Sequence, residues 1–195
     1  MVTLTNIVYL IASVLFILGL KNLSSPKTAR RGNLLSMSGM FLAVVITLFD
    51  KQILDFTYII AGIIIGAAIG TVAAKKVEMT AMPQMVALFN GFGGGASTLV
   101  ALSEFTQLTS DPVLNVSITL VLSIFIGTVT FTGSLIAFTK LQGLMRSAPI
   151  IYKLQHVVNA LLLVAVIVLG VIFTMNPITI SPLLVILAIA ALLGV

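Results

Sequence analysis

Seven apolar runs separated by short polar segments constrain the fold more than any other feature; they cover approximately residues 3–20, 33–49, 56–74, 83–104, 113–139, 154–174 and 183–195. A helix needs about 20 mostly apolar residues to cross a bilayer. Only 8% of the 195 residues are charged, whereas about a quarter are charged in soluble domains. We therefore predict an all-α polytopic transmembrane helix bundle, solvated by the lipid bilayer, with about six full spans plus a truncated seventh.

The two ends of the chain lead to two further predictions. The last run, residues 183–195, stops at Val195 without a polar flank. We interpret it as a truncated span, and residues 1–195 as a single transmembrane domain from a longer polypeptide. The first run has no basic residue before it and Lys21 after it, which is the reverse of the charge order in a signal peptide. It is therefore expected to be a true first span.

The basic residues accumulate on one side of the predicted bundle. Segments after the first, third and fifth spans hold nine bases and one acid, a charge of +8, whereas the other side holds one base and four acids, a charge of −3. Lys and Arg accumulate in cytoplasmic loops, so the N-terminus is expected outside. The net charge of +5 is therefore explained by membrane orientation, and it does not indicate a nucleic-acid-binding protein. The nine are Lys21, Lys27, Arg30, Arg31, Lys75, Lys76, Lys140, Arg146 and Lys153.

Several classes of function are disfavoured by composition. The chain has no cysteine and one histidine, His156, so a metal centre is not expected. The loops are too short for a catalytic domain in water. Residues 91–96 match the pattern G-x-G-x-x-A, but they lie inside an apolar run instead of after a strand, as a dinucleotide site requires. We predict no cofactor bound by this chain.

Glycines at intervals of four predict close helix packing. Gly62, Gly66 and Gly70 share one face of the third span, and Gly91 and Gly95 share one face of the fourth. Small residues allow helix backbones to approach in lipid, where no hydrophobic drive joins them. The alternative is that the close backbones line a narrow polar path.

Polar residues inside the fourth span are candidates for function, because they are costly in lipid. Asn90, Gly94, Ser97 and Glu104 lie near one helical face. Asn90 and Glu104 are separated by about 21 Å at 1.5 Å per residue. The stripe could form a wet path to the outer surface. The alternative is that Asn90 simply forms a hydrogen bond with another helix and that Glu104 lies at the membrane–water interface.

The fifth and sixth spans add further candidates. Thr130 and Ser134 share a face with Gly127, although hydroxyls in helices often bond to their own preceding turn. His156 begins the sixth span near the cytoplasmic surface, one turn before Asn159. Histidine can relay protons near neutral pH, or it can simply be interfacial. The predicted proton path is therefore Asn90, Ser97, Thr130, Ser134, His156 and Glu104.

Two stretches carry a resemblance to a known family. Residues 75–91, KKVEMTAMPQMVALFNG, and residues 125–134, FIGTVTFTGS, closely resemble the membrane domain of the beta subunit of proton-translocating nicotinamide nucleotide transhydrogenase. The resemblance implies part of a proton channel in a bacterial inner membrane. It also implies an alpha subunit that binds NAD, an NADP-binding domain of the same beta subunit beyond this chain, and a dimer of alpha–beta units.

The chain departs from the family at important positions. Family members can carry histidine where Asn90 stands and acids where Ala81 and Gln84 stand. Asparagine exchanges hydrogen bonds but does not titrate near neutrality. Proton passage at Asn90 would therefore need water or an ionisable group from another helix.

Two other classes of function remain open on the residues alone. A secondary transporter for a small solute would use the glycine-rich break in the fourth span. A structural membrane subunit would need neither Asn90 nor Ser134 to be polar.

Overall fold

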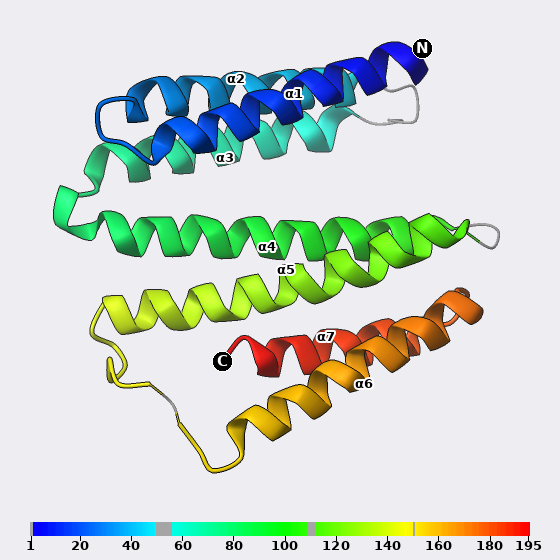
Figure 1. The fold of residues 1–195 in the computed structure, drawn as a ribbon. Helices are drawn as coiled ribbons and strands as arrows, with labels where there is room; N and C mark the ends of the chain where they lie inside the picture. The colour runs from blue at the N-terminus through cyan, green and yellow to red at the C-terminus, as the bar shows by residue number, and fades with distance from the viewer. Residues whose placement is uncertain (1, 50–55, 109–111, 150) are drawn as a thin grey trace. The chain divides into compact units, whose positions relative to one another are not determined.

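The computed structural model describes residues 2–49, 56–108, 112–149 and 151–195. Within these residues the secondary structure is entirely helical, with α1 (Val2–Leu23), α2 (Ala29–Leu48), α3 (Phe56–Lys76), the short 3-10 helix η1 (Met79–Ala81), α4 (Met82–Gln107), α5 (Leu114–Leu141), α6 (Gln155–Met175) and α7 (Ser181–Leu193) (Figure 1). In the described part of the chain, six helical spans are long and apolar enough to cross a membrane, and α7 is a shorter apolar helix. The predicted transmembrane helix bundle is confirmed. Asp50, Lys51, Asp55 and Asp111, used in the charge comparison, lie outside the described residues.

The chain divides into two compact units, Met1–Ala73 and Ala74–Val195. In the first, α1 and α2 form an antiparallel pair (Figure 1). A Cβ built on Gly32 would lie 2.7 Å from the backbone oxygen of Gly19, so the two backbones meet where neither residue has a side chain. Towards the other end of the pair, the hydroxyls of Tyr9 and Thr47 share a hydrogen bond of 2.8 Å.

The glycine face of α3 has no neighbour among the described residues. No described atom lies within 4 Å of a Cβ built on Gly62, Gly66 or Gly70, and no residue of α3 is buried. Close packing of this face therefore stays a prediction.

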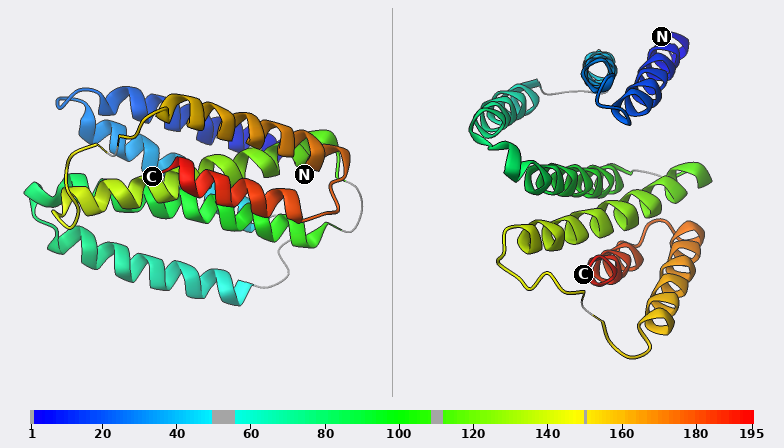
Figure 2. Two further views of the ribbon diagram at one scale, coloured as in Figure 1. Left: turned by 90° about the horizontal axis from the view of Figure 1, so that it is seen from below. Right: turned by 60° about the vertical axis from the view of Figure 1, so that its left-hand side comes forward.

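The second unit holds the buried core. Helix α7 packs against both α5 and α6 (Figure 2). Ile124, Phe173, Leu183 and Ile186 are fully buried where these helices meet. The ring of Phe105 on α4 lies 6.0 Å from that of Phe173, measured between centroids. The core thus fixes α4 and α5 relative to the following helices.

Local signals define the ends of the helices in this unit. Pro83 lies in the first turn of α4, where its missing N–H costs no helical hydrogen bond. Gly143, two residues beyond the end of α5, has a left-handed φ of +73°. The Gly143 N–H bonds to the Lys140 carbonyl, and the Leu144 N–H bonds to the Thr139 carbonyl, which is a Schellman motif.

Candidate functional site: the seam between α4 and α5

Helices α4 and α5 meet through small and polar side chains. The buried residues of α4 follow a spacing of three, four and three residues, which is the spacing of the inward positions of a coiled coil. We define the α4–α5 seam as Gly91, Gly94, Thr98 and Ala101 of α4 with Leu120, Ile124, Gly127, Thr128 and Ser134 of α5, all of them buried.

The two backbones touch at the middle of the α4–α5 seam. A Cβ built on Gly94 would lie 2.6 Å from the backbone oxygen of Gly127, and a Cβ on Gly127 would lie 2.6 Å from that of Gly94. Real Cβ atoms essentially never approach another atom so closely. Only glycine therefore fits at either position without moving the helices apart.

Asn90 and Ser134 form a hydrogen bond on one side of this contact. The Asn90 Nδ2 donates to Ser134 Oγ at 2.8 Å. Gly91 makes room for the serine, since a Cβ there would lie 3.1 Å from Ser134 Cβ. Ser134 is only 8% exposed, whereas Asn90 remains accessible on the side of α4. The structure thus brings together two of the residues predicted from the sequence.

A second polar pair, which sequence reasoning missed, lies on the other side of the contact. The hydroxyl oxygens of Thr98 and Thr128 are 3.3 Å apart, and both residues are buried. The Thr98 hydroxyl also donates to the Gly94 carbonyl at 3.2 Å. The three-four-three spacing of small residues in α4 is the signal that could have located Thr98.

Gln84 adds a polar group where α4 begins and α5 ends. Its Nε2 donates to the Leu141 carbonyl at 3.2 Å. Its Oε1 is buried with no hydrogen-bond partner among the described residues. The amide orientation is fixed because a carbonyl can only accept. A donor such as water is therefore needed to satisfy Oε1.

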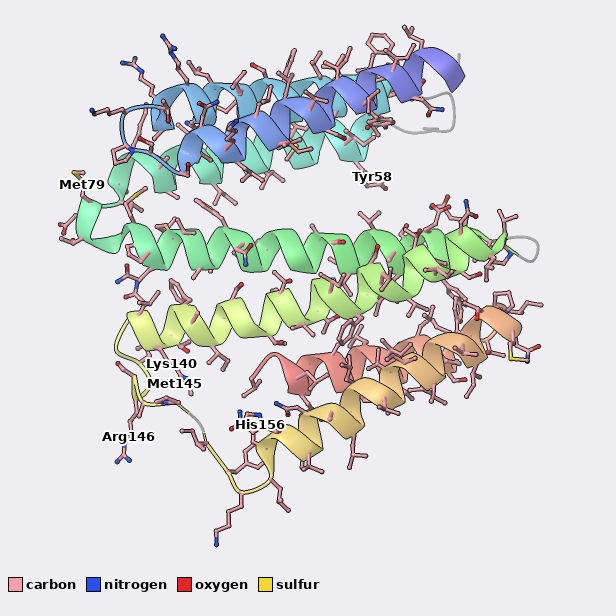
Figure 3. All side chains as sticks on the ribbon, in the orientation of Figure 1. Tyr58, Met79, Lys140, Met145, Arg146 and His156 are labelled. Atoms are coloured by element: carbon pink, nitrogen blue, oxygen red, sulfur yellow. The ribbon has the colours of Figure 1, made fainter. Side chains whose placement is uncertain are left out.

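The other predicted residues are more dispersed. Thr130 is partly buried and lies against Gly94, whereas Ser97 and Glu104 are exposed because they lie around α4 from its α5-facing side. His156 is exposed in the first turn of α6 (Figure 3). Their roles, with those of Asn90 and Ser134, stay predictions. A Cβ built on Gly95 would lie 3.1 Å from the ring of Phe131. Gly94, rather than the predicted Gly95, therefore makes the close contact with the backbone of α5.

Comparisons with known proteins agree on one family. A sequence model of the family described as "NAD(P) transhydrogenase beta subunit" matches residues 5–195. Two curated relatives, both named NAD(P) transhydrogenase subunit beta and both from Rhodospirillum rubrum, one of them from a specified strain, are 42% identical over 161 residues. That match covers 79% of this chain and 35% of each relative. The chain therefore spans about a third of the length of the curated relatives it matches.

Proposed function

Because the chain belongs to the family of NAD(P) transhydrogenase beta subunits, we propose that it forms part of the proton path through the membrane. In this proposal the complete enzyme couples hydride transfer between NADH and NADP⁺ to inward proton movement. The observation that supports it most directly is the Asn90–Ser134 hydrogen bond inside a bundle of membrane-spanning helices.

Asn90 and Ser134 would act on protons by holding water. Neither side chain titrates near neutral pH, but an amide and a hydroxyl each donate and accept hydrogen bonds. Asn90 uses one of its two amide protons on Ser134. Its second proton and its carbonyl oxygen are left to hold a water molecule on the accessible side of the pair. A proton can then pass through ordered water without residing on either side chain.

The proposal assigns the hydride-transfer chemistry to parts of the enzyme beyond these 195 residues. NAD would bind to the alpha subunit, and NADP would bind to another domain of the beta subunit. Lys140 lies in the last turn of α5, and Arg146 lies in the segment between α5 and α6 (Figure 3). We assign contacts with the NADP-binding domain to this segment and to the one that contains η1.

The assembly and its orientation are also part of the proposal. The beta subunit would pair with an alpha subunit, and two alpha–beta units would form a dimer in the bacterial inner membrane. The N-terminus would face outward, since this places the nine basic residues of the predicted inner loops in the cytoplasm.

Replacement of Asn90 by leucine in the intact enzyme tests the proposal. Asn90→Leu keeps a side chain of similar size and removes every polar atom that could hold water. In proteoliposomes we expect proton pumping and coupled hydride transfer to fall together, by about tenfold or more if one hydrogen-bonded step is lost. Hydride transfer to a nucleotide analogue in a reaction that needs no proton movement should be retained.

Asn22→Leu is the matched control. The Asn22 amide donates only to the Leu18 carbonyl of its own helix in the described hydrogen bonds, and it is partly exposed at the end of α1. This variant should pump at the normal rate. Unchanged pumping in Asn90→Leu would remove Asn90 from the proton path.

A further inference from the structure

The buried threonine pair lies beyond the residues that the proposed path already uses. Thr98 is eight residues from Asn90, which corresponds to about 12 Å along α4. Between the two pairs stands the backbone contact of Gly94 with Gly127. Polar groups therefore occur on both sides of a closed point in the α4–α5 seam.

The two threonine hydroxyls have a defined hydrogen-bond order. A hydroxyl has one proton to donate, and that of Thr98 goes to the Gly94 carbonyl. The proton between the two hydroxyls must then come from Thr128. This order leaves lone pairs of Thr128 Oγ1 free to accept from a water molecule. The chain of donors points from Thr128 through Thr98 to Gly94, which is the glycine at the closed point.

A groove adjoins the threonine pair. Thr98 and Thr128 line a groove of about 580 Å³ bounded by α4, α5 and Leu187 of α7. The rest of its lining is apolar or glycine, including Phe92 and Phe131. In such surroundings the two hydroxyls are the groups at which a water molecule can be held.

We propose that Thr98 and Thr128 form a second, outward polar step of the proton path, which joins the Asn90–Ser134 step when α4 and α5 separate at Gly94 and Gly127. This inference rests on the proposed function. The free lone pairs of Thr128 Oγ1 would accept a hydrogen bond from a water molecule, and the proton would pass along the ordered water without residing on either hydroxyl. Thr98 and Thr128 are thus assigned as positioning residues for water.

The test uses the complete enzyme in proteoliposomes with Thr98→Val and Thr128→Val. Valine keeps the branch of threonine at Cβ and replaces the hydroxyl with a methyl group. We expect proton pumping to fall about tenfold in each variant, for one lost hydrogen-bonded step. Thr98→Ser and Thr128→Ser retain the hydroxyl and should restore pumping. The solvent deuterium isotope effect on coupled hydride transfer should rise in the valine variants, which a purely structural pair would not cause.

Thr119→Val is the control, since Thr119 lies on α5, the helix that carries Thr128. The Thr119 hydroxyl is exposed and donates to the Asn115 carbonyl of its own helix at 2.8 Å. This variant should pump normally. Should a valine variant fail to assemble, Thr98→Ala and Thr128→Ala, which only remove atoms, replace it with the same expected loss.

Two results overturn the inference, and they can be separated from failure of the proposed function. Normal pumping in the valine or alanine variants, or an unchanged isotope effect, removes the threonine pair from the path. If Asn90→Leu still abolishes pumping, the proposed function stands and only this inference fails. If Asn90→Leu also pumps normally, both fail.

Discussion

Asn90 and Ser134 depend on each other, because the amide of one donates to the hydroxyl of the other at 2.8 Å. If they hold one water molecule together, removal of either partner should disable the same step. Asn90→Leu and Ser134→Ala should each lower pumping, and the double variant should pump no less than the more impaired single variant. A double-mutant cycle on the initial pumping rate measures this coupling. Additive losses would show that the two residues act independently.

Gly94 is a position where a single added methyl group is expected to disturb the α4–α5 seam. In Gly94→Ala the new Cβ would meet the backbone oxygen of Gly127, and overpacking of this kind costs about 1–3 kcal/mol. Gly93→Ala is the control, because no described atom lies within 4 Å of a Cβ there. Chromatography of the detergent-solubilised enzyme after heating should show a lower midpoint for Gly94→Ala alone. Equal midpoints would contradict the close contact.

At the residue scale the sequence predicted the candidates better than their arrangement. Polar types inside an apolar run pointed to Asn90 and Ser134, which the structure joins. Ser97 and Glu104 are exposed, because the buried positions of α4 run through Gly91, Gly94, Thr98 and Ala101, a register that leaves Ser97 and Glu104 off the side that faces α5. The spacing within α4 could have located Thr98, but its pairing with Thr128 was missed because the pairing depends on which sides of two helices face each other.

Gly143 shows how one residue defines the end of an element. Its left-handed φ of +73° closes α5 through two backbone hydrogen bonds. Gly143→Ala should destabilise this end by about 1–2 kcal/mol, whereas Gly143→Asn should cost less because asparagine tolerates this conformation. Proteolysis of the exposed segment at residues 142–149 should be faster in the alanine variant than in the asparagine variant. The same cleavage rate in both would contradict the role of the left-handed turn.

At the element scale the sequence was most informative, since each apolar run of spanning length became a helix. Several of the observed helix ends extend beyond the runs. Helix α2 begins at Ala29 and includes Arg30 and Arg31, because helical hydrogen bonding continues past the hydrocarbon core into the headgroup region. Which helices pack against each other was harder to predict from the sequence. The regular glycines of α3 meet no described atom within 4 Å, whereas the irregularly spaced Gly19, Gly32 and Gly39 join α1 to α2.

The whole molecule is expected to have one orientation, set by its basic loops. These 195 residues contain no cysteine, so a single cysteine introduced here has no background from this part of the subunit. Lys27→Cys and Gln107→Cys lie at exposed positions at opposite ends of the predicted spans. A membrane-impermeant thiol reagent should label Gln107→Cys in intact cells and Lys27→Cys only in inverted vesicles. The reverse labelling would place the N-terminus inside.

The central claim is that the α4–α5 seam admits water during turnover, and the reactivity of a buried cysteine tests it most directly. Ser134→Cys places a thiol of similar size at a site that is 8% exposed. With a water-soluble methanethiosulfonate and the intact enzyme, we expect its labelling rate to rise when both nucleotides are supplied. Leu122→Cys, on the exposed apolar side of α5, should show no such change. A Ser134→Cys labelling rate that is the same with and without nucleotides would contradict a water-filled path between these helices.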